Sequence, residues 1–430
     1  MQLFSASLPS RVNIVDAFIA LHSTDEYSFC LDREHNPANR FSVIGAASQV
    51  HTVETSDFAG LQEILSSYEV SEAELPFDFR PGLVGAISYE GQANFLGIDR
   101  AIVVDHDNNA AWFIGLFDTE SEFVSWRDAA LLRLALIGGE GAVYRHKNPI
   151  ISFSAELVQS RHSDEKYLEL IALAKESIAR GDVYQLCLTN QLSVEKSSDP
   201  LAVFIKLREL NPAPYLSFLR FGETTLVSSS PEQFLRATAG GKLSSKPIKG
   251  TRPRSKDIEE DKAIALELSA NEKERAENLM IVDLMRNDLG RVSAPEDVVV
   301  EKLFDVESYS SVHQLVSTIT AKLKPGLNVF DAVAACFPAG SMTGAPKIRA
   351  IEILQGLEQG DRGLYSGVHG YVTASGAADL AMTIRTIVFE DGVATIGIGG
   401  GITIDSDPQS ELLETKLKAK ALLMALGVEQ

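Results

Sequence analysis

Hydrophobic and polar residues alternate in short runs along the first third of the chain. Runs such as FSVIGAA at 41–47, GLVGAISYE at 82–90, AIVVDHD at 101–107 and AWFIGLFD at 111–118 are separated by Gly, Asp and Asn. Apolar runs of this length, bounded by turn residues, are typical of β-strands. Residues 12 to about 136 are therefore predicted to be rich in strands, and they carry no obvious chemistry.

A helical pattern follows the Gly-rich, charged stretch IGGEGAVYRHKNP at 137–149, which is the best candidate for a connection between two regions. Ser163 can cap a helix that ends before Gly181, and the strand-like run VYQLCLTNQL comes directly after it. Near the C-terminus, YSGVHGYVTA, DLAMTIRTIVFED and VATIGIGGGITI read as successive strands between Gly and Asp turns. This pattern favours antiparallel sheet with interspersed helices, an α+β class.

A second helical segment, SANEKERAENLMIVDLMRNDLG, carries carboxylates along its apolar stripe. Ser269 and Glu272 have the spacing of a capping box. After them, Glu274 and Glu277 share one helical face with apolar residues one and two turns further on. Carboxylates that continue an apolar stripe are costly to bury unless they bind a cation or are paired. A solvated face with Glu–Arg pairs explains the pattern equally well.

Another helix is predicted to begin at Asp407 and Pro408, a favourable cap and first-turn pair. It places Glu411, Glu414 and Lys418 on one side. Oxygen ligands from two helices are what Mg²⁺ prefers, whereas zinc would call for His or Cys. Each ExxE spacing is common alone, so the indication of a magnesium site comes from the combination of the two helices.

The charge and the cysteine content of the chain exclude some classes of binding partner. The 430 residues include 39 basic and 59 acidic ones, a net charge of −20, which argues against nucleic acid or an anionic membrane as partner. A small anionic substrate would then need a local cluster of cations. The three cysteines form no CxxC or Cys/His group, so we expect them in the core of a protein from a reducing compartment. No leader or long apolar run is visible, and a cytoplasmic protein is expected.

The motifs along the second half of the chain resemble those of one enzyme family. In order they are VYQLCLTNQ, NPAPY, SSSPEQF, PIKGTRPR, ERAENLMIVDLMRNDLGRV, FPAGSMTGAPK, LYSGVHGYV, AMTIRT, GIGGGI and ELLETKLKAK. On these motifs the chain resembles the chorismate-utilising enzymes, which include anthranilate, aminodeoxychorismate, isochorismate and salicylate synthases. The resemblance covers nearly the whole chain and is strongest from residue 182 to residue 421.

The resemblance implies a fold and a division of the chain. The fold would be two stacked, largely antiparallel sheets flanked by helices, with the active site in a cleft between them. Residues 1–150 would be an N-terminal region like that of anthranilate synthase component I, packed into the same overall fold. Residues 156–425 would be the chorismate-binding catalytic domain.

The resemblance also implies where metal and substrate bind. Glu277 and Glu414 would hold Mg²⁺, with Glu274 and Glu411 as outer or supporting ligands. Arginine can bind a carboxylate through two N–H groups, and a Gly-rich turn lets backbone N–H groups approach one closely. The residues that would receive the substrate and its carboxylates are Gln185, Gly250, Thr251, Tyr365, Arg385, Gly399, Gly400, Gly401 and Lys418.

Three further side chains resemble the family's groups around the leaving hydroxyl. His313 alone would more often be a hydrogen-bonded core histidine, but its place in the pattern puts it beside that hydroxyl, with Ser341 nearby. Glu232 matches the general acid that protonates the departing hydroxyl. A carboxyl must keep its proton to do this, so an environment that raises its pKa is predicted.

Two positions separate the activities within the family. Water-using relatives carry a lysine where this chain has Gln185, so isochorismate and salicylate synthesis are disfavoured. Anthranilate synthases typically read PIAGT where this chain reads PIKGT, the form of aminodeoxychorismate synthases. Lys249 would attack ring carbon 2 as the hydroxyl leaves carbon 4, and ammonia would then add at carbon 4 and expel the lysine. Taken alone, a lysine in a loop is usually solvated.

Ammonia must come from solution or from another chain, because no cysteine lies in a GxCxG nucleophile turn. The family's usual source is a glutamine amidotransferase subunit, so a heterodimer is expected. No lyase segment follows residue 430, which implies that the reaction stops at 4-amino-4-deoxychorismate, a precursor of 4-aminobenzoate and folate. NPAPY at 211–215 matches part of the family's tryptophan pocket, but Arg33 stands where a serine is usual, which argues against tryptophan binding.

Two other functions stay open from the sequence. An anthranilate synthase would share every site residue except Lys249. A non-catalytic subunit that kept the fold would bind chorismate without turnover, although the complete set of site residues argues against it.

Overall fold

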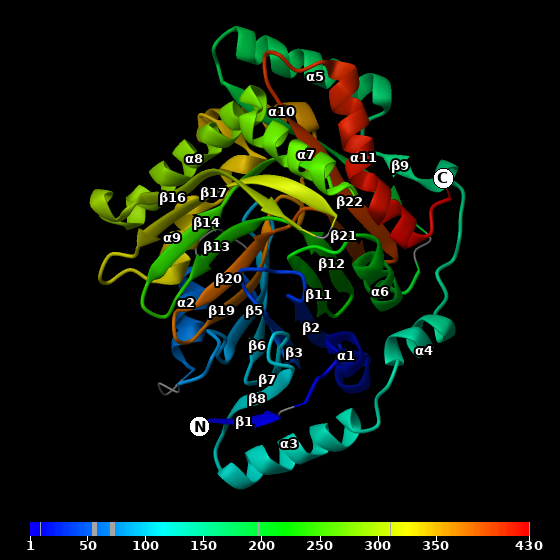
Figure 1. Cartoon of the computed structure of the whole chain (residues 1–430), viewed down its shortest axis with the longest axis vertical. Coiled ribbons are helices and arrows are strands. Elements are labelled where there is room, and N and C mark those ends of the chain that lie inside the picture. Colours follow the sequence, from blue (N-terminus) through cyan, green and yellow to red (C-terminus); the bar gives the residue numbers. More distant parts are fainter. Residues whose placement is uncertain (9, 54–57, 69–73, 196–197, 310, 430) are drawn as a thin grey trace.

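Two β-sheets stack face to face, and helices cover their outer faces (Figure 1). This computed structural model describes residues 1–8, 10–53, 58–68, 74–195, 198–309 and 311–429. The strand pairs that it describes within both sheets are antiparallel. The predicted class, α+β with two stacked and largely antiparallel sheets, is confirmed.

Over the described residues, the larger sheet has twelve strands in the order β1-β8-β7-β3-β2-β11-β12-β21-β22-β10-β18, with β9 beside β10. Its strands are β1 (Gln2–Leu8), β2 (Tyr27–Asp32), β3 (Phe41–Ala46), β7 (Arg100–Asp105), β8 (Ala110–Phe117), β9 (Gln159–Ser160), β10 (Gln185–Val194), β11 (Tyr215–Phe221), β12 (Thr224–Ser230), β18 (Gly344–Ala345), β21 (Thr386–Glu390) and β22 (Val393–Ile402).

The smaller sheet has ten strands within the described parts of the chain, in the order β15-β17-β14-β13-β20-β19-β5-β6-β4, with β16 beside β17. Its strands are β4 (Val50–Val53), β5 (Gly82–Ile87), β6 (Ala93–Ile98), β13 (Gln233–Ala237), β14 (Lys242–Lys246), β15 (Ile248–Pro253), β16 (Val299–Ser308), β17 (Val312–Lys322), β19 (Val368–Thr373) and β20 (Ala378–Met382).

The helices lie outside the two sheets (Figure 1). The outer face of the larger sheet packs on α1, α6 and α11, that of the smaller sheet packs on α2, α8 and α9, and α5 and α10 pack over β10. Their bounds are α1 (Ile14–His22), α2 (Ala59–Ser66), α3 (Glu120–Leu134), α4 (Glu140–Lys147), α5 (Asp164–Ala179), α6 (Pro200–Leu210), α7 (Ile258–Ala270), α8 (Glu272–Val292), α9 (Val329–Cys336), α10 (Lys347–Glu358) and α11 (Pro408–Leu426).

Apolar side chains from both sheets fill the space between them. Leu31 of β2 and Val103 of β7 come from the larger sheet, while Val84 of β5 and Leu96 of β6 come from the smaller one. All four are at most 1% exposed. Burying a side chain of this size contributes about 1.5–3 kcal/mol, so this layer is a main source of stability.

The strand-rich first third and the helix capped by Ser163 agree with the sequence prediction. The Ser163 hydroxyl accepts the backbone N–H of Lys166 at the start of α5. Asp407 likewise caps α11 by accepting from the N–H of Ser410. These side chains replace intrahelical acceptors that the first turn lacks.

The predicted capping box of Ser269 and Glu272 is wrong. Ser269 belongs to the last turn of α7, where its hydroxyl donates to the carbonyl of Leu266. Asn271 is the cap, and its side chain accepts the N–H of Glu274. Asn is as good a cap as Ser, and it lies at the corner where one helix ends and the next begins.

The run DLAMTIRTIVFED, read as one strand, is two strands in different sheets. β20 belongs to the smaller sheet and β21 to the larger one. The chain crosses between them at Arg385, whose φ of 51° lies in the left-handed region. A non-glycine residue in this region is uncommon, so the crossing holds Arg385 in a specific conformation.

Both halves of the chain contribute strands to both sheets. In the larger sheet β2 pairs with β11, and in the smaller sheet β5 pairs with β19. The expected boundary near residue 150 stays a prediction, since the N-terminal region shares its sheets with residues 156–425. None of the helices in the described ranges is long and apolar enough to cross a membrane.

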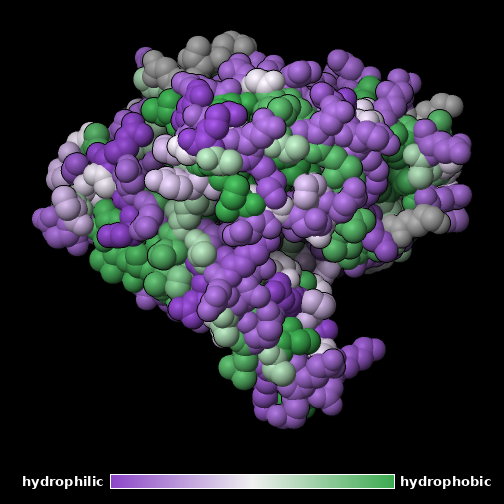
Figure 2. Space-filling model, turned by 90° about the horizontal axis from the view of Figure 1, so that it is seen from above, coloured by the Kyte–Doolittle hydropathy of each residue, from purple (hydrophilic) through white to green (hydrophobic). Residues whose placement is uncertain are grey.

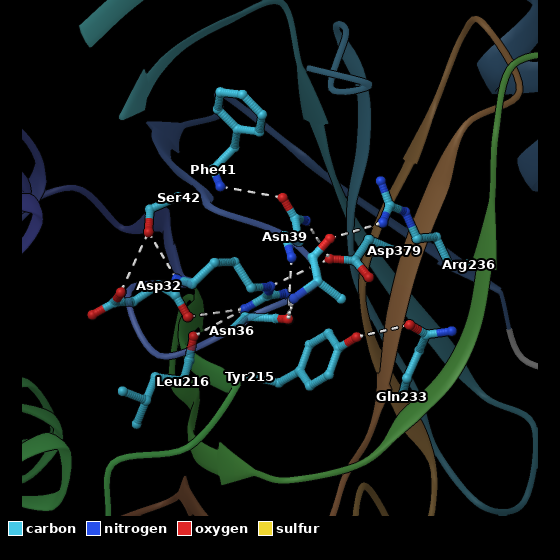
Figure 3. A network of polar contacts seen from close by, with 12 residues as sticks. Asp32, Asn36, Asn39, Phe41, Ser42, Tyr215, Leu216, Gln233, Arg236 and Asp379 are labelled. Atoms are coloured by element: carbon cyan, nitrogen blue, oxygen red, sulfur yellow. Dashed lines mark hydrogen bonds and ion pairs between the residues drawn. The ribbon is translucent and has the colours of Figure 1, made fainter. Parts of the chain in front are cut away.

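A buried ion pair joins the two sheets (Figure 3). Arg33, just after β2, binds Asp379 of β20 at 3.3 Å, and both side chains are 1% exposed. The guanidinium lies 4.7 Å from the centre of the Tyr215 ring and donates to the carbonyl of Leu216. The Asp379 carboxylate also accepts from Asn39. Arg33, which stands where the family usually has a serine, thus has a structural role between the two sheets.

We expect Arg33→Ala to lower the free energy of unfolding by about 3–5 kcal/mol, because it leaves the Asp379 carboxylate buried without its cation. Urea denaturation measures this loss. The matched control is Arg100→Ala, which removes a pair with Asp99 whose side chains are 40% and 42% exposed. The control should cost less than about 1 kcal/mol. Equal losses in the two variants would contradict a special role for the buried pair.

Candidate active site

Lys249 stands where segments from both sheets meet. It lies in β15, and its Nζ is 3.7 Å from Oε2 of Glu277 on α8. A Cβ added to Gly401 of β22 would come within 3.3 Å of Lys249 Nζ and 2.5 Å of Gln185 Nε2. Glycine at position 401 therefore lets the amide and the amine lie side by side. Four predicted site residues, distant in sequence, converge here.

Gln185 begins β10 and points into this cluster. Its side chain is 1% exposed, and neither its amide nitrogen nor its amide oxygen has a hydrogen-bond partner. A buried polar group without a partner costs about 1–3 kcal/mol. An amide retained at such a cost beside Lys249 is suited to binding a small polar ligand.

Glu232 follows β12 and is 7% exposed. Burial raises its pKa to about 7, although the charge of Lys249 and hydrogen bonds from Ser341 and the backbone of Ile248 act in the opposite direction. The predicted rise of this pKa is present. The hydrogen bond places Ser341, in the short turn Gly340–Met342, beside Glu232, while its predicted position near the leaving hydroxyl stays a prediction.

Two of the four predicted metal ligands are on α8 and two are on α11. Burial raises the pKa of Glu277, and the charges of Glu274 and Glu411 raise it further, so these carboxylates lie near one another. Burial would also raise the pKa of Glu414, but Lys418, 2.7 Å away, lowers it overall.

Each carboxylate has a partner within the protein. Glu277 contacts Lys249, Glu414 contacts Lys418, Glu274 contacts Arg252 at 3.3 Å, and Glu411 accepts from the Ser406 hydroxyl at 2.7 Å. Across the described ranges, no three His, Cys, Asp or Glu side chains converge as a ready-made metal centre. The donor chemistry is that of a hard cation, since carboxylate oxygens dominate and neither His nor Cys is among the predicted ligands.

The glycine run Gly399 to Gly401 lies in strand β22, in agreement with the reading of VATIGIGGGITI as a strand. Gly399, Gly400 and Gly401 face Thr189, Leu188 and Cys187 of β10. Lys418 Nζ donates to the Gly399 carbonyl at 2.8 Å. The N–H of a strand residue points to the same edge as its carbonyl, so the Gly399 N–H also faces the side of the strand away from β10. The backbone N–H group of Gly399 is therefore available near Lys418, and no glycine side chain blocks the approach of a ligand to it.

Tyr365 and Arg385 border the same strand. The Tyr365 ring occupies the space that a Cβ on Gly397 would need, and burial raises the pKa of its hydroxyl. Arg385 donates to the Lys418 carbonyl at 3.2 Å, and burial lowers its pKa. The charge of Glu414 also acts on Arg385. Arg385 thus lies beside α11, which carries the predicted metal ligands Glu411 and Glu414, and Tyr365 lies against β22.

Gly250 and Thr251 follow Lys249 in β15. Gly250 has a φ of 81°, and a Cβ there would lie 2.9 Å from the Glu274 carboxyl group. Glycine is therefore required both by conformation and by space. The Thr251 side chain is exposed, and its role in substrate binding stays a prediction.

His313 is held by hydrogen bonds to two side chains. Its Nδ1 is 2.8 Å from the Ser308 hydroxyl, and its Nε2 is 2.9 Å from Asp261, which Arg254 also binds. Within the described ranges, no hydrogen bond joins it to Glu232 or Ser341. Its predicted place beside the leaving hydroxyl stays untested, and its surroundings are those of a hydrogen-bonded buried histidine.

Sequence reasoning missed several partners of the site. Lys273 lies 3.8 Å from Glu277, and it could have been found from its position four residues earlier on the same helix. Arg252 pairs with both Glu274 and Glu267, and Asp261 pairs with His313. These contacts join separate elements, so spacing along the chain gave no signal for them.

Comparison with known proteins places the chain in a family. The model of the chorismate binding enzyme family matches residues 26–424. The chain belongs to the chorismate-binding enzyme family. It is 39% identical to aminodeoxychorismate synthase of Streptomyces griseus over 99% of this chain and 64% of that protein. It is 34% identical to anthranilate synthase component 1 of Methanothermobacter thermautotrophicus over 96% of this chain and 91% of that protein.

A solved structure has the same fold as this chorismate-binding enzyme. Anthranilate synthase component I from Streptococcus pneumoniae superposes with a TM-score of 0.76 at 27% identity, over 97% of this chain and 92% of that one. The chain spans about half the length of the aminodeoxychorismate synthases that it matches, from 42% to 64%. The similarity therefore covers only part of those longer proteins.

Glu232→Gln tests the raised pKa through stability. An unfolded glutamate ionises near its ordinary pKa of 4.5, whereas folded Glu232 keeps its proton up to about 7. The contribution of Glu232 to stability is thus fully present below pH 4.5 and is lost as the pH rises through 7, and the variant lacks this pH dependence. We expect the variant to gain about 3 kcal/mol relative to the wild type between about pH 4 and pH 8.

Urea denaturation at both pH values measures this change. Glu272→Gln is the control, because Glu272 is exposed on α8 and its replacement should shift stability equally at the two pH values. A Glu232→Gln difference that does not depend on pH would mean that Glu232 ionises normally.

Proposed function

We propose that this enzyme aminates chorismate to 4-amino-4-deoxychorismate. The observation that carries the proposal is the place of Lys249, whose amine lies beside Glu277 and Gly401 and whose charge acts on the protonated Glu232. A lysine amine and a carboxyl with a raised pKa thus lie in one cluster, and we propose that they act as nucleophile and general acid. The similarity to proteins named aminodeoxychorismate synthase supports the same reading.

The proposed reaction divides the work among these groups. The unprotonated Lys249 amine forms a bond from Nζ to ring carbon 2 while the hydroxyl leaves carbon 4, and Glu232 gives its proton to that hydroxyl, which departs as water. Ammonia then bonds to carbon 4, the Lys249 nitrogen leaves carbon 2 as the neutral amine, and the new ammonium group gives one proton back to Glu232. Gln185, with both amide atoms unpartnered, is positioned to bind the incoming ammonia.

Substrate carboxylates need cations and backbone donors, and the site offers both. Arg385 and Lys418 lie next to the strand of Gly399, Gly400 and Gly401. We propose that this edge binds the carboxylates of chorismate, with Tyr365 beside them. Such contacts would hold the ring so that carbon 2 faces Lys249.

A magnesium ion is proposed at Glu277 and Glu414, with Glu274 and Glu411 supporting them. A bound Mg²⁺ would supply positive charge for a substrate carboxylate. Glu277 is buried near two further carboxylates, and the nearby lysines provide the compensating charge in this structure. The carboxylates would exchange these lysine contacts for the metal.

Ammonia is proposed to come from a glutamine amidotransferase subunit. All three cysteines are buried, and burial raises the pKa of each thiol, so none resembles an exposed nucleophile. The face at the top of Figure 1 is mostly hydrophilic with scattered hydrophobic residues (Figure 2). Its elements include exposed apolar side chains that a partner could cover, namely Tyr184, Ile348, Leu413 and Leu417.

Tryptophan regulation is not proposed for this enzyme. Arg33 is buried, paired with Asp379 and stacked on Tyr215 of the NPAPY motif. This side chain fills the space beside that motif, whereas a serine would leave it open. The proposed cellular setting is the cytoplasm, with the product leading toward 4-aminobenzoate and folate.

Anthranilate synthesis is the second candidate, because relatives with that name cover most of this chain. The two reactions differ in their use of Lys249, because no lysine nucleophile is needed when ammonia adds directly at carbon 2. Incubation with chorismate, Mg²⁺ and ammonium separates them. Formation of 4-aminobenzoate only after an aminodeoxychorismate lyase is added would support the proposal, whereas fluorescent anthranilate without lyase would favour the second candidate.

Lys249→Ala should lower ammonium-dependent formation of 4-amino-4-deoxychorismate by a factor of about 100 or more, because the variant has no nucleophile. Coupled turnover with the lyase measures the rate, and intact-mass spectrometry of the wild type with chorismate checks for a covalent adduct. Lys242→Ala on the same sheet removes an exposed lysine and should retain full activity. Undiminished turnover in Lys249→Ala would exclude the covalent route.

Glu277→Gln and Glu414→Gln should each raise the Mg²⁺ concentration needed for half-maximal activity by about tenfold or more, because each removes a charged oxygen ligand. Activity measured against Mg²⁺ concentration after chelation checks this. Glu272→Gln, on the same helix as Glu277 but exposed, is the control and should leave the requirement unchanged. Unchanged requirements in all three variants would remove the magnesium assignment from these helices.

A further inference from the structure

A cavity lined by residues other than those of the candidate active site lies near the segment that leads to Ser341. Its volume is about 550 Å³, and it is enclosed by α9, α10, the turn between β5 and β6, and the segment after α10. Cavities of about 300–1,000 Å³ are of the size that holds a small organic molecule. None of the site residues described above lines it.

The floor of this cavity is apolar and contains one unused polar group. Phe58, Phe337 and Leu354 line it, and two of them are almost fully buried. Tyr89 also lines the cavity, and its hydroxyl is buried and has no hydrogen-bond partner within the described residues. A buried hydroxyl without a hydrogen-bond partner lowers the stability of the protein. Its presence here therefore favours a ligand with a polar group that forms this hydrogen bond.

The charges around the cavity favour a cationic ligand. Arg362 lies 4.2 Å from the centre of the Tyr89 ring, but Glu358 binds its guanidinium through two hydrogen bonds of 2.8 and 2.7 Å and neutralises it. Glu90 and Asp361 add negative charge at the rim. Arg362 is the only Lys or Arg among the described lining residues, so an anionic ligand would find no free cation here.

The same arginine reaches the active site from behind. Arg362 donates to the carbonyl of Met342, the residue after Ser341, and to the carbonyl of Cys187, two residues after Gln185. Phe337, on the floor of the cavity, begins the segment that leads to Ser341. A ligand that packs against Tyr89 and Phe337 therefore touches the supports of the Ser341 turn and of β10.

We propose that this cavity is a second small-molecule site, which takes a flat apolar group carrying an amine, and that Arg362 links its occupancy to chorismate binding. The apolar group would pack on Phe337 and Leu354, while the amine would meet the Tyr89 hydroxyl and the Glu90 carboxylate. By linkage, a ligand that favours one position of the Ser341 turn changes the affinity for chorismate, and chorismate changes the affinity for the ligand by the same factor.

Benzylamine, benzyl alcohol and benzoate are suitable probes, because they have similar shapes and differ in charge. Ligand-observed NMR titrations of the full chain should give saturable benzylamine binding with a Kd on the order of 1 mM, weaker binding of benzyl alcohol and none of benzoate. Ala334→Phe, which fills the cavity from the exposed side of α9, should weaken benzylamine binding at least about tenfold. Tyr89→Phe should weaken it about three- to tenfold.

Ala129→Phe, a matched change at an exposed position of α3, should leave benzylamine binding unchanged and controls for folding and surface effects. Glu277→Gln should also leave it unchanged, which separates this cavity from the carboxylates of the active site. Benzylamine binding that Ala334→Phe does not weaken, or equal binding of benzoate, would overturn the site.

Addition of chorismate with Mg²⁺ and without ammonium should change the benzylamine Kd by at least about threefold, and an unchanged Kd would overturn the link through Arg362.

Discussion

The close pairing of the glycine segment of β22 with β10 is the constraint on which the site depends. A side chain at Gly397 would overlap the Tyr365 ring, one at Gly399 would meet the Leu188 carbonyl at 2.5 Å, and one at Gly401 would strike Gln185. These approaches are open only to glycine. They bring an amide, an amine and a phenol from three other elements against one strand, and this strand becomes the floor of the site.

Opposite charges balance one another inside this cluster. Lys249 and Lys418 face Glu277 and Glu414. Burial raises the pKa of both Glu232 and Glu277 despite the nearby cations, and that of Glu232 reaches about 7, whereas Lys418 lowers the pKa of Glu414. A nearby opposite charge favours the ionised form of a carboxyl, and burial favours the protonated form. The same cluster therefore contains both an acid and several fixed charges, which is the division that amination with loss of water needs.

Local patterns in the sequence predicted several helices and strands. The features that these patterns did not predict depend on contacts between distant segments. The Ser163 cap, the strands of the first third and the helix at Asp407 depend on neighbouring residues, and they were readable. The pairing of the glycine run with β10 was not predicted, because it involves residues about 200 positions away. The crossing at Arg385 and the partners of His313 were invisible for the same reason.

The two sheets carry complementary parts of the site, so their separation determines its geometry. α8 packs on β17 of the smaller sheet and supplies Glu277, while α11 packs on β22 of the larger sheet and supplies Glu414. A cation held by both carboxylates would join the sheets across the substrate. The Arg33–Asp379 pair already joins them elsewhere, and it needs no ligand. A permanent link between the sheets limits how far the carboxylates must move, which lowers the ordering cost of binding metal and substrate together.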